Sequence, residues 1–394
     1  MQNLPDKKQC CGCGVCTQIC PKQCITMQAD EEGFLYPAVN DDACIHCGLC
    51  EKTCPVRNVQ PEAEGKPKAF AAFSRDEHER QSSSSGGIFS LLAEQVLECG
   101  GAVFGAEMAA DCRSVNHSAT ESPEELCRLR GSKYLQSTIG STYAQAKEFL
   151  DAGRRVLFSG TPCQIEGLKS FLKKDYDNLL CVDVICHGAP SPKLWEKYID
   201  YREHQAGAAV QRTIFRHKKY GWKSYAVLLE FSNNTAYEQI LSKDLYMQMF
   251  LQDLCLRPSC YDCKFKKLHR VSDITLADFW GCERVCPEMD DDRGLSAVLI
   301  HSDKGQKAFE GIQDQCVSRQ VECSQIAAGN PALMKSCAMP EKRDAFMAQI
   351  DRLSIPRLAK KYLRKPSRKA MILSRIILLI PPGIRKNLKR ILRR

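Results

Sequence analysis

Two short cysteine runs near the N-terminus have the residue type and the spacing of metal ligands. Each run follows the pattern C-x2-C-x2-C-x3-C-P, so three cysteines stand close together and a fourth precedes a proline. The members are Cys10, Cys13, Cys16 and Cys20 before Pro21, and Cys44, Cys47, Cys50 and Cys54 before Pro55. Three thiolates at this spacing surround one 4Fe-4S cube from a tight loop. The pattern therefore predicts two iron–sulfur clusters and the transfer of single electrons.

The repeated run resembles that of bacterial two-cluster ferredoxins, in which the fourth cysteine of each run binds the other cluster. On that rule the first ligand set is Cys10, Cys13, Cys16 and Cys54, and the second is Cys44, Cys47, Cys50 and Cys20. The alternative is a pair of zinc knuckles, which seldom repeat with a proline after the last cysteine. Cys11 and Cys24 lie outside the pattern, and we expect His46 at the surface.

Composition limits where such a chain works. It has 24 cysteines in 394 residues, and its N-terminus lacks the apolar segment of a signal peptide. We therefore expect the cytoplasm, where thiols stay reduced and clustered cysteines more often bind metal. The net charge of +9 is uneven, because residues 357–394 contain 14 Lys and Arg and no acidic residue. The rest of the chain is slightly acidic.

Helices and strands alternate after the cysteine runs. We expect helices near 88–99, 142–153, 165–174 and after 191 and 303, strands near 100–108, 154–160, 179–186 and 296–302, and a hairpin over 214–233. The predicted fold is an α+β ferredoxin-like dicluster domain, then an α/β domain with a mixed, largely parallel sheet, and a basic helical tail. The predicted segments are 1–57 for the dicluster domain, 58–68 for a linker, 69–150 and 151–340 for two further domains, and 341–394 for the tail.

Three loops at predicted strand or helix ends carry residues that suit a binding site, since ligands of such sheets bind at the carboxyl ends of strands. The loop before Gly87 offers small residues and free N–H groups to a phosphate, or is a flexible cap. The other two place Cys163 and Cys186 at strand ends. Cys260 and Cys263 form a CxxC pair, which is half of a cluster site or a redox disulfide. Cys255 is a rival fourth ligand.

Several blocks in order resemble a known family. They are SSGGIFS, GSKYLQS, GTPCQIEGLK, ICHGAPSP and LRPSCYDCKFKKLHRVSDITLADFWG, between residues 68 and 300. They are similar to the beta subunits of coenzyme F420-reducing hydrogenase and of F420-dependent formate dehydrogenase, and to a plant hydroxymethyl-chlorophyll reductase. The resemblance implies FAD and a third 4Fe-4S cluster held by Cys163, Cys186, Cys260 and Cys263. It also implies that the flavin is lined by Ser84, Ser85, Gly86, Gly87, Gly131, Ser132, Lys133, Tyr134, Gly160, Thr161 and Pro162.

A flavin beside iron–sulfur clusters converts single electrons into a two-electron hydride. In that arrangement we expect Lys133 to stabilise reduced flavin or a phosphate, and Asp278 to order a nearby base or hydroxyl. The sequence thus predicts an iron–sulfur flavoprotein oxidoreductase with an electron donor or acceptor protein and a small-molecule redox substrate, F420 being one candidate. The alternative is a non-catalytic electron-transfer subunit that docks on a separate hydrogenase or dehydrogenase.

The basic tail combines cations with the apolar stretch Ile376–Ile380 and is broken by Pro381 and Pro382. This stretch is too short to span a bilayer, which needs about 20 residues. It suits either peripheral binding at the inner face of the membrane or a solvated, partner-binding role. We expect no nucleic-acid partner, because no binding module accompanies the charge.

Overall fold

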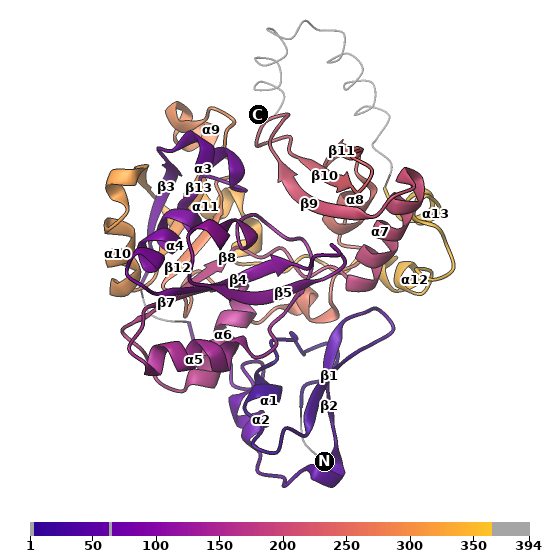
Figure 1. The fold of residues 1–394 in the computed structure, drawn as a ribbon, viewed down its shortest axis with the longest axis horizontal. Helices are drawn as coiled ribbons and strands as arrows, with labels where there is room; N and C mark the ends of the chain where they lie inside the picture. Colours follow the sequence, from indigo (N-terminus) through magenta and orange to yellow (C-terminus); the bar gives the residue numbers. More distant parts are fainter. Residues whose placement is uncertain (1–3, 63–64, 365–394) are drawn as a thin grey trace, which may run out of the picture.

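The computed structural model describes residues 4–62 and 65–364 (Figure 1). Its N-terminal part, drawn in indigo, contains a two-stranded antiparallel sheet and two short helices. The elements are α1 Val15–Gln18, β1 Ile25–Ala29, β2 Leu35–Val39 and α2 Leu49–Thr53. Gly14 and Gly48 precede the two helices with φ of +71° and +69°, a left-handed conformation that side chains disfavour. Each glycine thus turns its cysteine run into a helix.

The main sheet combines strands from far-apart parts of the sequence. In the described residues it has nine strands in the order β14-β3-β13-β12-β8-β7-β4-β5-β6. They are β3 Lys68–Ser74, β4 Ala102–Met108, β5 Val115–Thr120, β6 Ser137–Thr138, β7 Val156–Gly160, β8 Leu179–Val184, β12 Ile274–Asp278, β13 Ser296–Ile300 and β14 Cys316–Val321. Pairing is parallel along β12, β8, β7 and β4 and between β5 and β6. The other pairs are antiparallel, which confirms the predicted mixed sheet.

Helices cover both faces of this sheet because its strands are apolar on both sides. In β7, Leu157 packs on one face, and Val156 and Phe158 pack on the other. Helices α4 and α10 cover the first face, and α5, α6 and α11 cover the second. The helices here are α3 Glu77–Ser82, α4 Ile88–Glu98, α5 Thr142–Asp151, α6 Pro162–Leu172, α9 Cys282–Val285, α10 Asp303–Glu310 and α11 Cys323–Gly329.

The helices and strands expected from the sequence over 88–186 and 296–310 are present within a few residues of their predicted ends. The boundary expected at residue 150 is not a boundary of the sheet, because 69–150 contributes β4, β5 and β6 and 151–340 contributes β7, β8 and β12 to the same sheet. Hydrogen bonding between β4 and β7 makes the two segments one folded unit.

A second group of elements packs beside the sheet around its own apolar core, and we call it the lobe. It contains a three-stranded antiparallel sheet, which includes the predicted hairpin, and four helices. The elements are α7 Pro192–Ala206, β9 Val210–His217, β10 Ala226–Phe231, β11 Ala236–Ile240, α8 Leu245–Leu251, α12 Arg343–Met347 and α13 Ile355–Tyr362.

Short 3-10 helices occur in the connecting segments of all parts of the described chain. They are η1 Asp41–Ala43, η2 Glu124–Arg128, η3 Pro258–Asp262, η4 Pro287–Met289, η5 Gln313–Gln315 and η6 Pro331–Leu333.

The predicted tail therefore starts inside the folded lobe. Ile355, Leu358 and Tyr362 of α13 are buried in the lobe core, although the segment is rich in basic residues. The remainder of the predicted tail, 365–394, lies outside the described residues, and so does its expected membrane contact. Within the described ranges, none of the helices is both long and apolar enough to cross a bilayer.

The carboxyl ends of the parallel strands meet at one edge of the main sheet, which we call the carboxyl edge. β7 ends there at Gly160, β8 at Val184 and β12 at Asp278. The antiparallel β13 begins at this edge, because Ser296 pairs with Asp278. Loops that follow these strands are therefore held close together.

Candidate metal centres and cofactor loops

Four cysteines from both N-terminal runs surround the first cavity. They are Cys10, Cys13, Cys16 and Cys54, and they line one pocket. All four are buried. The first three come from the loop and helix around α1, and the fourth ends α2. The fold thus gathers the same four thiols that the crossed ferredoxin rule selects for its first cluster.

The second cavity is lined by the complementary set. Its cysteines are Cys20, Cys44, Cys47 and Cys50, joined by Cys24, around about 260 Å³ of empty space. The Sγ atoms of Cys20 and Cys24 are 3.4 Å apart. The backbone N–H of His46 donates to Cys44 Sγ at 3.3 Å, and the His46 side chain is at the surface as expected. Backbone donors to sulfur are typical of sites that stabilise thiolate ligands.

Electrostatics favour a cation in these cavities. Burial, together with the neighbouring Cys10 and Cys54 thiols, raises the pKa of Cys16 to about 12. Thiolates gathered in such a place repel one another and lose solvation. Metal ions provide the positive charge that converts clustered cysteines to thiolates. The residues present therefore fit iron–sulfur clusters.

A third set of cysteines meets at the carboxyl edge. Cys163 lies in the first turn of α6, Cys186 follows β8, and Cys260 and Cys263 lie in and after η3. Their thiols interact electrostatically, and burial followed by the Cys163 thiol raises the pKa of Cys186 to about 12. Lys266 Nζ donates to the carbonyl of Cys186 at 2.9 Å. The structure brings together the four cysteines that the family resemblance groups.

Cys255, the rival ligand, lies elsewhere. It is fully buried, and the charges that act on it are those of Arg343 and Asp253. Its own backbone carbonyl accepts from Ser191, which ties it to the start of α7. The CxxC pair is therefore completed more readily by Cys163 and Cys186 than by Cys255.

Cys11 connects the first cavity with the third set. It lines the first cavity beside Cys13, and its thiol interacts with both Cys13 and Cys163. A hydrogen bond with Cys11, followed by burial, raises the pKa of Cys163 well above its usual range. The repeated sequence pattern gave Cys11 no role because this residue lies outside it. In three dimensions it stands between the two groups of thiols.

Arg257 fixes the dicluster domain to the rest of the protein. Its buried guanidinium donates to the carbonyls of Cys10 at 2.7 Å and Leu35 at 2.9 Å, and to Gln136 Oε1 at 3.0 Å. It also lies 3.6 Å from Cys10 Sγ. Gly167 of α6 also approaches this domain closely, because a Cβ there would stand 3.3 Å from Cys13 Sγ. The junction is closely packed.

Two of the predicted flavin loops are bonded to each other. Ser84 Oγ accepts from the backbone N–H of Ser132 at 2.6 Å, and the N–H of Gly86 donates to Ser296 Oγ at 2.9 Å. Lys218 Nζ donates to the carbonyl of Ser85 at 2.7 Å and to two further carbonyls. The third loop, Gly160 to Pro162, begins α6 with a capping box formed by Thr161. These loops gather at the carboxyl edge.

The Lys133 side chain is hydrogen-bonded to backbone carbonyls. Its Nζ donates to the carbonyls of Arg128 and Arg130 at 2.9 Å each. Burial lowers the pKa of Lys133 to about 7. A lysine in this state changes charge close to neutral pH, which suits a group near a redox cofactor. Its role toward a flavin stays a prediction.

Asp278 is paired rather than free. Its carboxylate accepts two bonds from Arg216, at 2.6 Å and 3.0 Å, and one from Trp222 Nε1 at 2.7 Å. Trp222 stacks on Trp280 with ring centroids 4.8 Å apart. Burial acts to lower the pKa of Arg216, but the charge of Asp278 and neighbouring tyrosines outweigh it, and the pKa is raised. Asp278 can position neighbouring groups, and its proposed ordering role stays a prediction.

Two buried nitrogens near these loops lack partners among the described residues. They are Nδ1 of His117 and Nε of Arg216. The other His117 nitrogen is bonded to the carbonyl of Ser159 at 3.0 Å, next to the Gly160 loop, and Arg216 donates to Tyr134 Oη at 3.2 Å. Buried unsatisfied polar groups often mark a site for a missing ligand. The residues present therefore fit a polar cofactor such as a flavin.

Comparison with known protein families gives two matches. Residues 153–324 match the family described as the C terminus of the coenzyme F420 hydrogenase/dehydrogenase beta subunit. Residues 9–58 match the 4Fe-4S dicluster domain. The chain thus combines a match to the dicluster domain with a match to the C-terminal part of the F420 hydrogenase/dehydrogenase beta subunit, which confirms the resemblance found in the sequence.

One similar solved structure comes from the F420-reducing NiFe hydrogenase complex of Methanosarcina barkeri, in a xenon-derivatised form. The similarity has a TM-score of 0.46 at 15% identity and covers 69% of this chain and 93% of that chain. A search of curated proteins found no match to this sequence.

Sequence reasoning missed three residues of these beta-subunit and dicluster sites. Arg216 and Arg257 each fill a buried position beside a predicted site residue, Asp278 and Cys10. Cys11 contacts Cys163. The sequence alone does not show that an arginine is buried against a particular partner, and the partners of Arg216 and Arg257 are far away in the sequence.

Proposed function

We propose that this chain is an iron–sulfur flavoprotein oxidoreductase that moves electrons between a protein partner and a small-molecule hydride carrier. The observation that supports this most is the contact of Cys11 with both Cys13 and Cys163. Cys11 thus links a thiol of the first set to a thiol of the third. Electron transfer between redox centres needs such proximity, and the fused dicluster domain supplies it within one chain.

The chain's own residues would hold three clusters. Cys10, Cys13, Cys16 and Cys54 hold the first, Cys20, Cys44, Cys47 and Cys50 the second, and Cys163, Cys186, Cys260 and Cys263 the third. Lys266 and Arg270 add positive charge beside the third set, which offsets the charge of its thiolates.

The loops at Ser84 to Gly87, Gly131 to Tyr134 and Gly160 to Pro162 would bind FAD at the carboxyl edge. A bound flavin exchanges a hydride with a substrate and single electrons with iron–sulfur clusters. Lys218 keeps the Ser85 carbonyl in place, and Arg216 with Asp278 places a paired charge in the polar wall of the site. Lys133, whose pKa is lowered to about 7 by burial, supplies a proton or a positive charge near neutral pH.

The loop of the second cysteine run suits contact with an electron-transfer protein. Ile45 is 55% exposed and Cys47 is at the surface, whereas the first cysteine set is buried. Electrons would enter or leave at this loop. Weak electron-transfer encounters use small interfaces, and one exposed loop is enough for such a contact. This exposure also supports the second candidate function, a non-catalytic subunit that passes electrons to a separate hydrogenase or dehydrogenase.

The test is the iron, sulfide and flavin content of protein purified without oxygen. We expect about twelve irons, given four per cluster, and about one flavin per chain. Cys163→Ala should lose about four irons and keep about eight. The matched control is Cys255→Ala, which removes a buried cysteine outside the three sets and should keep all twelve.

About eight irons without flavin would overturn the proposal and leave an electron-transfer subunit. Loss of iron from Cys255→Ala would show that the third set has been chosen wrongly. Reduction of F420 or another hydride acceptor by the isolated chain, supplied with a reduced ferredoxin, separates the catalytic function from the docking function. If the chain needs a second protein for activity with every acceptor that is tested, the docking function is favoured.

A further inference from the structure

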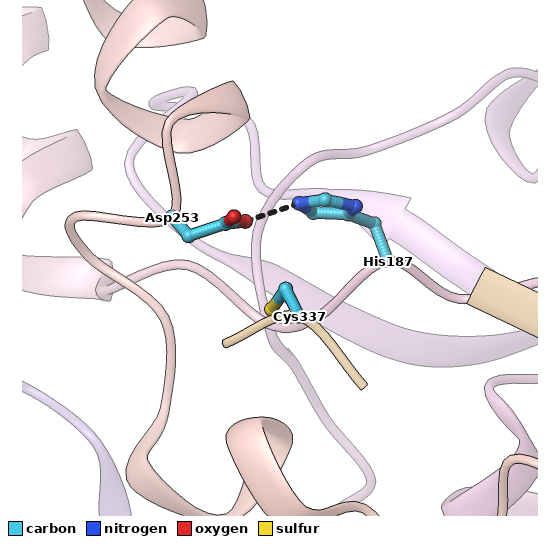
Figure 2. A group of neighbouring side chains, drawn as sticks. All are labelled: His187, Asp253 and Cys337. Atoms are coloured by element: carbon cyan, nitrogen blue, oxygen red, sulfur yellow. Dashed lines mark hydrogen bonds and ion pairs between the residues drawn. The ribbon is translucent and has the colours of Figure 1, made fainter. Parts of the chain in front are cut away.

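We propose that His187, Asp253 and Cys337 form a mononuclear zinc site, separate from the three cysteine sets. Figure 2 shows the three side chains converging from three segments of the chain. Their donor atoms, an imidazole nitrogen, a carboxylate oxygen and a sulfur, all lie within 4.8 Å of one another. Nitrogen, oxygen and sulfur are the ligands that Zn²⁺ takes in proteins.

The geometry is close to that of a metal site. His187 Nε2 and Asp253 Oδ1 are 2.6 Å apart and share a hydrogen bond. Ligand atoms around a tetrahedral zinc stand about 3.3 to 3.8 Å from each other, given zinc–ligand distances of about 2.0 to 2.3 Å. A separation of the pair by less than about 1.5 Å, with loss of the shared proton, therefore makes room for the ion. Cys337 interacts with the Asp253 carboxylate, which places its sulfur on the same side.

The surrounding residues hold the ligands in place. Asp253 has a left-handed backbone with φ of 61°, an unusual conformation for a residue with a side chain. Its carbonyl accepts from Tyr261 Oη at 2.5 Å. The His187 ring packs edge-on against Phe250 with centroids 5.2 Å apart. The hydrogen bond and the ring contact hold Asp253 and His187 in position.

Among the described residues, no lysine or arginine forms an ion pair with the Asp253 carboxylate, whose partner is His187. A second group with metal-binding residue types, Cys282, Glu283 and Asp290, has its own cation, because Lys223 Nζ lies 2.7 Å from Asp290 and 3.2 Å from Glu283. In the first group the neighbouring Lys266 Nζ is bonded to the carbonyls of Cys186 and His187 instead. Of the two groups, only the one in Figure 2 has no lysine or arginine of the described chain paired with its carboxylate.

Zinc at this position would fasten the segment around Cys337 to the carboxyl edge. The adjacent Ser336 already accepts from the backbone N–H of Cys263, and His187 follows Cys186 directly. Both contacts involve loops that carry cysteines of the third set. Three protein ligands leave one position of a tetrahedron for water, and the half-exposed His187 provides access to solvent. The ion thus supports the third cysteine set without sharing its ligands.

The test uses the full chain, purified without oxygen and fully loaded with iron, then given one equivalent of Zn²⁺ and desalted. We expect about one zinc per chain, and X-ray absorption at the zinc edge should show one sulfur neighbour at about 2.3 Å and nitrogen or oxygen neighbours at about 2.0 to 2.1 Å. This measurement is specific to zinc and is unaffected by iron.

Cys337→Ser and Asp253→Asn should each lower zinc content at least fivefold while iron and sulfide stay at the wild-type level. Asparagine tolerates the left-handed backbone, so Asp253→Asn decides the question if Cys337→Ser does not fold. Cys282→Ser is the matched control and should keep its zinc. Wild-type protein with less than a tenth of a zinc, zinc retained by both variants, or loss of iron from Cys337→Ser would each overturn the assignment.

Discussion

The charge of Arg257 should control the reduction potential of the first cluster site. Its guanidinium is buried and lies 3.6 Å from Cys10 Sγ, and the rest of its hydrogen bonds go to neutral groups of Cys10, Leu35 and Gln136. Reduction adds a negative charge to a cluster. A fixed positive charge beside its ligand stabilises the reduced form and raises the potential. Arg257→Gln removes that charge and keeps one amide donor for the carbonyls.

The size of the effect follows from the distance. Two unit charges 3.6 Å apart interact by about 4.6 kcal/mol at an effective dielectric constant of about 20. The added electron spreads over the whole cluster, so about half of this, ~2.3 kcal/mol, acts on the reduction step. For a one-electron couple about 1.4 kcal/mol corresponds to 59 mV. We therefore expect the potential to fall by about 100 mV in Arg257→Gln.

Anaerobic redox titration followed by electron paramagnetic resonance measures this shift. Arg257→Lys is the matched control, because it loses the fork of hydrogen bonds but keeps the charge. We expect its potential to stay within about 30 mV of the wild type, against about 100 mV for the glutamine variant. Equal shifts in both variants would attribute the effect to hydrogen bonding. No shift in Arg257→Gln with a full iron content would refute the charge argument.

Two further predictions concern stability in urea. Asp278→Asn leaves the buried Arg216 without its ion partner and should cost about 3 to 5 kcal/mol, whereas Glu230→Gln, which breaks the exposed pair with Arg212, should cost less than about 1 kcal/mol. Equal losses of unfolding free energy in the two variants would contradict the argument that burial makes the Arg216–Asp278 pair important. The second prediction concerns pH, because burial lowers the pKa of His117 from 6.5 to about 4. Between these two pH values the unfolded chain binds a proton at this histidine and the folded chain does not. The free energy of unfolding therefore falls as the pH falls. At pH 5 this amounts to about 2 kcal/mol relative to pH 8. His117→Gln should remove that loss. Parallel curves of unfolding free energy against pH for the wild type and the variant would contradict this role of His117.

The sequence predicted what depends on local spacing. Each cysteine run is a local pattern, so its three neighbouring ligands follow from the turn and the helix that the run must form. The strands that end at Gly160 and Val184 are equally local, because a buried apolar run bounded by a loop predicts a strand end. Parallel strands place such ends at one edge, and this brought Cys163 and Cys186 together in the prediction.

What the sequence did not predict depends on partners far away in the chain. Arg216 lies in a hairpin strand of the lobe, and only the packing of that lobe on the sheet reveals Asp278 as its partner. The folded part of the tail is a different case. Ile355, Leu358 and Tyr362 recur at helical spacing, and the predicted helical tail includes them. Their burial in the lobe was not predicted, because it depends on helices and strands far away in the sequence.

The arrangement of thiols explains why a dicluster domain is fused to this sheet. The fourth cysteine of each N-terminal set comes from the other run, so in the proposed function the two sets cannot move apart without breaking both. Arg257 and Gly167 then fix the first set against α6, whose first turn carries Cys163. A separate ferredoxin would have to find this contact by diffusion at every transfer. In the proposed function, covalent fusion makes the inner transfer permanent and leaves only the exposed loop at Ile45 for exchange with another protein.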